Sequence, residues 1–150
     1  MIKNLLLDMG GVILNVSYQK VIDTFKSYGI ENFDKVYCQA KQVEIIDLFE
    51  EGRCGAEEFR DGVRKLLDKD LTDEQIDKAW FSMILEIPKD VIQLLGLLKL
   101  KYRLFLFSNT NVLHIEYLKK EFERQLGFDL FGCVFDKAFF SNEIHHRKPH

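Results

Sequence analysis

Two polar groups occupy points of the sequence where a parallel sheet would place a ligand. Asp8 directly follows the apolar run Ile2–Leu7, and Ser108 and Asn109 directly follow a second apolar run. In an open parallel sheet, ligands bind beyond the carboxyl ends of the strands. If the two runs are neighbouring strands, a carboxylate and a hydroxyl meet in one crevice. The sequence therefore predicts a functional site at that edge of the sheet.

Each of these groups also has a purely structural interpretation. Asp8 alone is compatible with a turn, and the polar stretch Ser108-Asn109-Thr110-Asn111 is compatible with a helix cap. The pair Gly10-Gly11 after the aspartate permits a tight turn and a close approach of the backbone to a ligand. Taken together, the three features favour a functional site over a purely structural role.

The elements that would carry these residues alternate between strand and helix. Strands are predicted at Ile2–Leu7, at Arg103–Phe107 and, more briefly, at Cys133-Val134-Phe135, and helices at Lys89–Lys101 and Val112–Gln125. The first strand is expected to be buried on both faces, because its apolar run is continuous. This order predicts an α/β fold with a Rossmann-like parallel sheet. Val91, Leu94, Leu95 and Leu98 form an apolar stripe along the first of these two helices.

The long stretch between the first two strands is helical in pattern. Helices are predicted from the N-cap Ser17 to about Tyr28, at Phe33–Phe49, at Ala56–Leu67 and after the capping box that begins at Thr72. This stretch is too long for a single crossover. Residues 15–87 are therefore predicted to form a small helical subdomain, inserted into a core of residues 1–14 and 88–150.

Composition narrows the classes of protein. A chain of 150 residues that is 47% hydrophobic buries one core of ordinary size. Its 21 Lys and Arg against 24 Asp and Glu argue against nucleic-acid binding. No apolar run is long enough for a membrane span, and the N-terminal run is too short for a signal peptide. Three cysteines without C-x-x-C spacing argue against a disulfide framework or a zinc site and favour a cytoplasmic location.

Three motifs in order resemble those of the haloacid dehalogenase-like hydrolases. The segment Leu5–Ile13 resembles the first motif, an apolar strand, an aspartate and a Gly-Val-aliphatic run. Leu104–Asn109 resembles the second motif, an apolar strand that ends in Ser or Thr, and Lys148-Pro149 resembles the third. The inserted helices, about residues 15–87, resemble the small helical cap of the family, so the resemblance covers the whole chain.

The resemblance implies Mg²⁺-dependent phosphoryl transfer. Asp8 would attack phosphorus to form an aspartyl-phosphate, which water then hydrolyses. The Asp8 carboxylate and the carbonyl of Gly10 would bind Mg²⁺. Ser108 and the amide of Asn109 would hold the phosphoryl oxygens, and Lys148 would neutralise charge there and on Asp8. The implied substrate is a small phosphorylated metabolite, with a sugar phosphate favoured.

The sequence departs from the family pattern at the position of the general acid. Most phosphatases of the family carry a second aspartate where this chain has Gly10. General acid catalysis is typically worth about 10²–10⁴-fold. The Asp-x-Gly form resembles a subgroup that includes sugar-1-phosphate phosphatases and the phosphatase-like domain of epoxide hydrolases.

A second departure concerns the fourth motif, an acidic pair that supplies the remaining Mg²⁺ ligands. No such pair follows Lys148-Pro149, and Asp136 is not in the right context to replace it. We expect either a fragment of a longer phosphatase or a partner that completes the sheet, and in both cases weak Mg²⁺ binding and little phosphatase activity. The first strand would then be an open edge, which favours self-association.

Several alternatives stay open at this point. A metal-independent 2-haloacid dehalogenase would use Asp8 to attack carbon, and a non-catalytic module would keep only the phosphate cradle. Arg53, in the polar loop Glu50–Gly55, is expected either to contact a phosphate or sugar hydroxyl or to be solvated. The histidine-rich tail permits a metal site, although ordinary loop polarity explains it as well.

Overall fold

The computed structural model, which describes residues 1–36 and 44–149, contains a parallel sheet with the strand order β1-β2-β3. The strands are β1 (Asn4–Leu7), β2 (Arg103–Ser108) and β3 (Lys137–Phe140). In the register of the sheet, Leu7 pairs with Leu106, so β1 and β2 end almost level with each other. The predicted α/β fold with a parallel sheet is confirmed.

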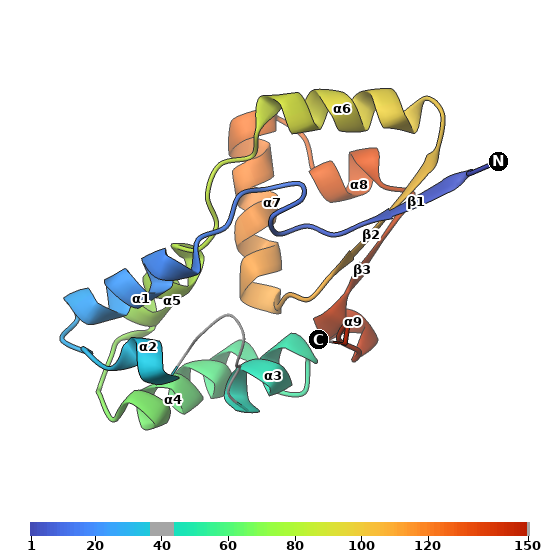
Figure 1. Ribbon diagram of the computed structural model, residues 1–150. Helices are drawn as coiled ribbons and strands as arrows, with labels where there is room; N and C mark the ends of the chain where they lie inside the picture. The colour runs from blue at the N-terminus through green and yellow to red at the C-terminus, as the bar shows by residue number, and fades with distance from the viewer. Residues whose placement is uncertain (37–43, 150) are drawn as a thin grey trace.

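Helices cover one face of this sheet (Figure 1). They are α6 (Lys89–Lys99), α7 (Val112–Leu126) and α8 (Leu130–Val134). Leu104 and Leu106 of β2 point toward them and are fully buried, in one apolar cluster with side chains from all three helices. The alternation of side chains along a strand places the neighbours of these leucines on the opposite face.

The expectation that the first strand is buried on both faces is wrong. Leu5 and Leu7 pack against the apolar cluster, but Leu6, on the opposite face, is 63% exposed. On α6, Leu94 of the apolar stripe is 54% exposed. The core contacts of α6 are made by other residues of the predicted stripe, including Leu95, which is 3% exposed.

The third strand lies later in the chain than predicted. The apolar triplet Cys133-Val134-Phe135 closes α8 and the turn after it, and the strand follows at Lys137–Phe140. Asp129 caps the helix by accepting a hydrogen bond from the backbone N–H of Phe131 at 3.1 Å. Periodicity alone cannot separate a short apolar run in a strand from one in a buried helix. After β3 the chain forms a further short helix, α9 (Ser141–Ile144).

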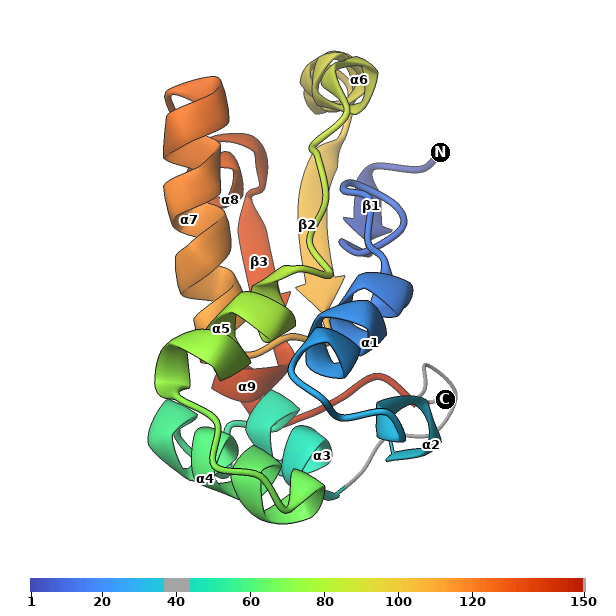
Figure 2. The same cartoon turned by 90° about the vertical axis from the view of Figure 1, so that its left-hand side faces the viewer.

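The stretch between β1 and β2 is helical, as predicted (Figure 2). It contains α1 (Tyr18–Ser27), α2 (Phe33–Val36), α3 (Glu44–Glu50), α4 (Ala56–Leu67) and α5 (Asp73–Phe81). The predicted caps are present, because the side chains of Ser17 and Thr72 each accept a hydrogen bond from the first turn. Of the helix predicted at Phe33–Phe49, residues 37–43 lie outside the described part of the chain.

These helices pack around a second apolar cluster that is rich in aromatic rings. Phe49 stacks on Phe59 with ring centroids 4.2 Å apart, and Phe59 contacts Trp80 at 5.0 Å. Leu113, in the first turn of α7, belongs to this second cluster, while later residues of α7 belong to the first. The start of α7 therefore joins the two apolar clusters.

His114 is buried at this junction. Its Nε2–H donates to the carbonyl of Trp80 at 2.9 Å, and its Nδ1 accepts from the amide of Asn111 at 3.3 Å. The imidazole ring also stacks on the Trp80 ring with centroids 5.1 Å apart. Burial lowers the pKa of His114 to about 4, so this histidine is neutral at pH 7.

We expect acid to destabilise the fold through His114. Its pKa is lower in the folded chain than in the unfolded one, so the stabilisation is complete above about pH 6.5 and is lost as the pH falls toward 4. The free energy of unfolding should drop by about 3 kcal/mol across that range from this group. Urea unfolding at several pH values should show a weaker pH dependence for His114→Gln. The exposed His146→Gln should keep the wild-type slope, and equal slopes in all three chains would contradict the assignment.

Gly52 permits a close approach between the turn after α3 and α9. Its φ is +66°, and a Cβ on it would lie 2.0 Å from the backbone oxygen of Asn142. We expect Gly52→Ala to lower the free energy of unfolding by at least about 2 kcal/mol, through backbone strain and overpacking. The matched control is Gly96→Ala on the open surface of α6, where nothing lies within 4 Å and helix propensity favours alanine. Similar unfolding midpoints for the two variants would show that the close approach is unimportant.

Candidate active site

A short loop holds Asp8 at the carboxyl end of β1. The carbonyl of Met9 accepts a hydrogen bond from the N–H of Ile13 at 2.8 Å, and Gly11 donates to the carbonyl of Leu14 at 2.8 Å. Gly11 has φ +75°, in the left-handed region that glycine adopts without strain. Within this loop the Asp8 Oδ1 accepts from the N–H of Met9 at 2.7 Å. The predicted turn thus fixes the carboxylate just beyond the sheet.

Lys148 brings a positive charge to the same carboxylate from a distant part of the chain. Its Nζ lies 2.8 Å from Asp8 Oδ1 and donates to the carbonyl of Phe107 at 3.0 Å. Its backbone N–H donates to Asn109 Oδ1 at 2.8 Å. Both contacts to the aspartate use Oδ1, and within the described residues Oδ2 has no partner. One carboxylate oxygen is therefore held and the other is available.

Four of the predicted site residues line one open pocket of about 350 Å³, namely Asp8, Ser108, Asn109 and Lys148. The predicted metal-binding Gly10 lines it as well. The hydroxyl of Ser108 is buried, and its contact with the carbonyl of Asn109, at 3.4 Å, is long for a hydrogen bond. The structure thus places a carboxylate, an ammonium group, a hydroxyl and an amide around one space at the carboxyl ends of β1 and β2.

The segment that carries Lys148 is anchored on two sides. Arg147, with a side chain only 10% exposed, forms ion pairs with Asp47 at 2.7 Å and with Glu50 at 3.0 Å, both on α3. Ser141 Oγ accepts from the N–H of Thr110 at 2.9 Å and donates to its carbonyl at 3.0 Å. The lysine is therefore positioned by the end of β2 and by the helices between β1 and β2.

Other candidates from the sequence lie away from this pocket. The Arg53 side chain is 63% exposed, pairs with Glu51 at 2.9 Å and does not line the pocket. Asp136 precedes β3 instead of following the third strand, and its Oδ2 accepts from the N–H of Leu104, near the beginning of β2. His145 Nδ1–H donates to the carbonyl of Glu51 at 2.8 Å.

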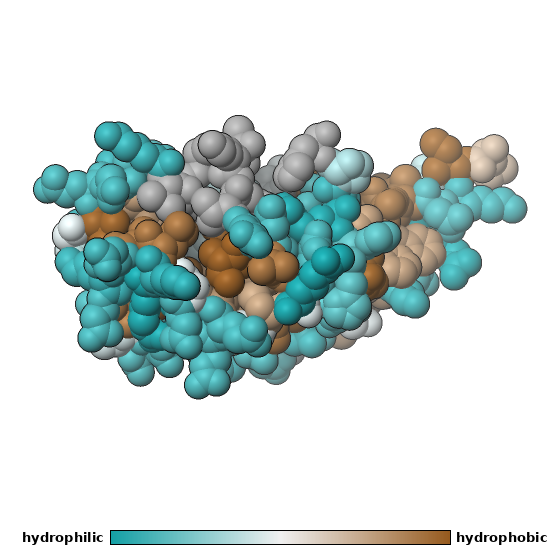
Figure 3. Space-filling model, turned by 90° about the horizontal axis from the view of Figure 1, so that it is seen from below, coloured by the Kyte–Doolittle hydropathy of each residue, from teal (hydrophilic) through white to brown (hydrophobic). Residues whose placement is uncertain are grey.

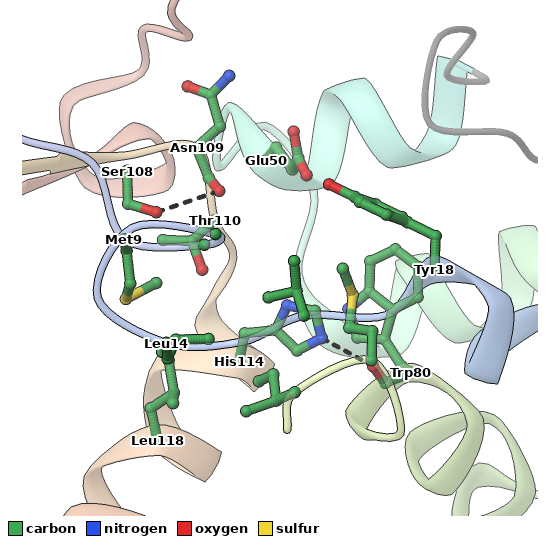
Figure 4. Close-up of a pocket in the computed structure, with 15 residues that line it drawn as sticks. Met9, Leu14, Tyr18, Glu50, Trp80, Ser108, Asn109, Thr110, His114 and Leu118 are labelled. Atoms are coloured by element: carbon green, nitrogen blue, oxygen red, sulfur yellow. Dashed lines mark hydrogen bonds between the residues drawn. The ribbon is translucent and has the colours of Figure 1, made fainter. Parts of the chain in front are cut away.

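A second cavity of about 180 Å³, called here the inner cavity, adjoins the open pocket (Figure 4). The two share Gly10, Tyr18, Ser108 and Asn109 in their walls. The inner cavity is also lined by Glu50 and Thr110, which sequence reasoning did not select as site residues. Glu50 begins the polar loop Glu50–Gly55 named in the sequence analysis, but its burial depends on tertiary contacts that have no local signal.

The oxygen donors at the open pocket fit part of the coordination sphere of a hard cation. Mg²⁺ keeps several waters and is usually bound by one or two carboxylates together with substrate phosphate oxygens. Asp8 and the backbone of Gly10 offer such donors. In residues 1–36 and 44–149 no group of three or more His, Cys, Asp and Glu side chains is placed to hold a metal ion. The described residues therefore suit Mg²⁺ that shares its ligands with phosphate and water.

Comparisons with known proteins agree with this geometry. No family model matches the chain. The D-ribitol-5-phosphate phosphatase of Bacteroides thetaiotaomicron is 32% identical over 151 aligned residues, which cover 99% of this chain and 72% of that protein.

Within the described residues, no helix has the length and apolar character needed to cross a membrane.

Solved structures show the same fold. A mutant of a HAD-family enzyme from Bacteroides thetaiotaomicron, in complex with magnesium and inorganic phosphate, has a TM-score of 0.93 and 36% identity, covering 99% of this chain and 73% of that one. A predicted HAD-like family hydrolase from Porphyromonas gingivalis has a TM-score of 0.86 and 29% identity, covering 100% of this chain and 71% of that one. The chain therefore belongs to the haloacid dehalogenase-like (HAD) hydrolases, and it is a phosphatase-type member of that family.

Proposed function

We propose that this hydrolase removes phosphate from a small phosphorylated sugar or sugar alcohol, with Asp8 as the nucleophile. The observation that carries the proposal is the 2.8 Å contact between Asp8 Oδ1 and Lys148 Nζ, in the pocket that Ser108 and Asn109 also line. The name of the phosphatase relative supports a sugar-alcohol phosphate as the substrate class. The same relative favours ester hydrolysis over dehalogenation, in which Asp8 would attack carbon.

The proposed reaction has two displacements at phosphorus. An oxygen of Asp8 forms a bond to phosphorus while the ester P–O bond breaks, and the leaving alkoxide takes a proton from water. Ser108 and Asn109 hold the phosphoryl oxygens, and Lys148 offsets their negative charge. Water then attacks phosphorus, which releases inorganic phosphate and restores the carboxylate. Mg²⁺ held by Asp8 and Gly10 would supply further positive charge to the phosphoryl oxygens.

We also propose that residues 15–87 act as a cap over a core of residues 1–14 and 88–150. Two separate apolar clusters support this division, one around β2 and one among α1 to α5. The position of Glu50, in the wall of the inner cavity next to the nucleophile, supports a role of these helices in substrate selection. A contact of Arg53 with substrate stays a prediction, and it would require the side chain to leave Glu51.

The chemistry of Asp8 can be tested directly. We expect Asp8→Asn to lower phosphate release from ribitol 5-phosphate, at high Mg²⁺ concentration, by about 10⁴-fold or more, because the attacking oxygen is lost. The matched control is Asp23→Asn, at an exposed position of α1, which should keep wild-type turnover. Acid quenching should trap covalent phosphate on the wild-type chain only. Unchanged turnover in Asp8→Asn would refute the assignment, whereas phosphate binding without turnover, in a chain that includes the fourth motif, would favour a non-catalytic module.

We further propose a cytoplasmic location and self-association through β1. Strand β1 lies at the edge of the three-stranded sheet. Its Leu6 is 63% exposed, and Ile2, which lies before the strand, is 69% exposed. Apolar side chains are visible at this end of the molecule in Figure 3. An exposed apolar edge strand pairs readily with another chain.

Sedimentation equilibrium tests the proposed pairing. We expect the wild-type chain to form dimers as its concentration rises, and Leu6→Lys to shift it toward monomer, because a lysine opposes edge pairing. The control is Leu66→Lys. Leu66 is an exposed leucine on α4, away from β1, and its substitution should leave the association unchanged. A wild-type chain that stays monomeric throughout would exclude this interface.

A further inference from the structure

We propose that the inner cavity binds an uncharged polyhydroxy chain, the alcohol part of the substrate, and rejects chains that end in an anionic group. Thr110 and Glu50 are the residues that would make this selection. The inference rests on the proposed function, because the cavity adjoins the pocket that would hold the phosphate. It adds discrimination against anionic leaving groups and names the side chains that would recognise the neutral one.

The size and position of the inner cavity suit a short chain attached to a phosphate. Ser108 and Asn109 line both spaces, so a phosphate in the open pocket would direct its ester group toward the inner cavity. The volume of about 180 Å³ is below the roughly 300–1,000 Å³ typical of pockets for larger ligands. Apolar side chains, including Val16 and Met83, form part of the wall and fit the C–H groups of such a chain.

Thr110 contributes a buried hydroxyl group to the residues that line the inner cavity. Thr110 is 3% exposed, and within the described part of the chain its Oγ1 has no hydrogen-bond partner. Its backbone N–H and carbonyl are both bonded to Ser141 Oγ, so the residue itself is firmly held. Buried polar groups are nearly always hydrogen-bonded, and each exception needs an explanation. A ligand hydroxyl would satisfy this one after a rotation of the Thr110 side chain toward the cavity, because Oγ1 itself exposes less than 1 Å².

Glu50 gives the wall of the inner cavity a negative charge. It is 9% exposed, and Figure 4 shows the Tyr18 hydroxyl pointing toward its carboxylate. Its ion-pair partner Arg147 is not in the cavity wall, and no lysine or arginine among the described residues lines the cavity. A ligand hydroxyl can donate to this carboxylate, whereas a second anionic group would be repelled at short range.

The other titratable groups in the wall do not offset this charge. Burial lowers the pKa of His114 to about 4, so its ring is neutral at pH 7. Burial, with smaller contributions from Glu50 and Asp8, raises the pKa of Tyr18, so the phenol stays protonated and can donate a hydrogen bond. Among the described residues, the wall therefore combines neutral hydrogen-bonding groups with the carboxylate of Glu50, whose ion-pair partner Arg147 lies outside the wall.

Calorimetry with matched ligands tests the inference. Metal-free protein carrying Asp8→Asn, which does not turn the ligands over, is titrated at pH 7 with ribitol 5-phosphate, with 5-phosphoribonate and with inorganic phosphate. The first two ligands differ at the end of their carbon chain that is distant from the phosphate, where the alcohol of ribitol 5-phosphate is replaced by a carboxylate. We expect ribitol 5-phosphate to bind about tenfold or more tightly than 5-phosphoribonate.

Variants in the same background separate the two residues. Thr110→Val should weaken ribitol 5-phosphate binding about threefold to tenfold and leave inorganic phosphate unchanged, while Thr110→Ser should retain the wild-type affinity. Glu50→Gln should improve 5-phosphoribonate binding about tenfold. Asp47→Asn is the matched control, because Asp47 pairs with the same Arg147 but does not line the cavity. It should change neither ligand by more than about twofold.

The outcomes distinguish the inference from the proposed function. Failure of inorganic phosphate and of both ligands to bind would overturn the proposed function. Phosphate binding with equal affinity for the two ligands, or with no effect of Thr110→Val, would overturn the inference alone. If Asp47→Asn reproduced the effect of Glu50→Gln, the selection would act through the Arg147 anchor, and a direct role of Glu50 would be excluded. The comparison of the two ligands stands even if Glu50→Gln does not fold.

Discussion

The contact between Asp8 and Lys148 is the interaction on which the whole site depends. It joins two residues from opposite ends of the sequence, and it exists only because several independent elements converge. The register of β1 and β2 places Asp8 beside the end of β2, and the carbonyl of Phe107 and the side chain of Asn109 hold the lysine. An ammonium group in this place puts positive charge beside the carboxylate, where it would offset the negative charge of a phosphate that approaches the proposed nucleophile.

The open pocket and the inner cavity carry groups of opposite charge, which would favour one orientation of a bound ligand. Lys148 supplies positive charge to the open pocket, whereas Glu50 supplies negative charge to the inner cavity. A molecule with a dianionic end and a neutral hydroxylated end is matched in one orientation and mismatched in the other. Orientation of this kind places the reacting phosphorus at the nucleophile before any bond changes, which is a large part of catalysis in phosphoryl transfer.

The sequence predicted the parts of the site that follow strands, because strand ends are local signals and the carboxyl edge of a parallel sheet is a known meeting point. It also predicted the caps at Ser17 and Thr72, where a side chain bonds its own helix. The sequence-based predictions were incomplete where contacts between distant residues determine secondary structure or burial. The triplet at Cys133 has the same apolar character in a strand or in a helix, and the burial of Glu50 follows from contacts with Arg147, distant in sequence.

The same contacts that place the lysine also place the wall of the inner cavity. Arg147 is the neighbour of Lys148 in the chain, and its guanidinium binds Asp47 and Glu50 on α3. The close approach of Gly52 to Asn142 joins the end of that helix to the same segment. A displacement of α3 would therefore move Glu50 and pull on the backbone of Lys148 together. One short segment therefore anchors both Glu50 and Lys148, so the proposed substrate selection and the proposed charge stabilisation would be coupled.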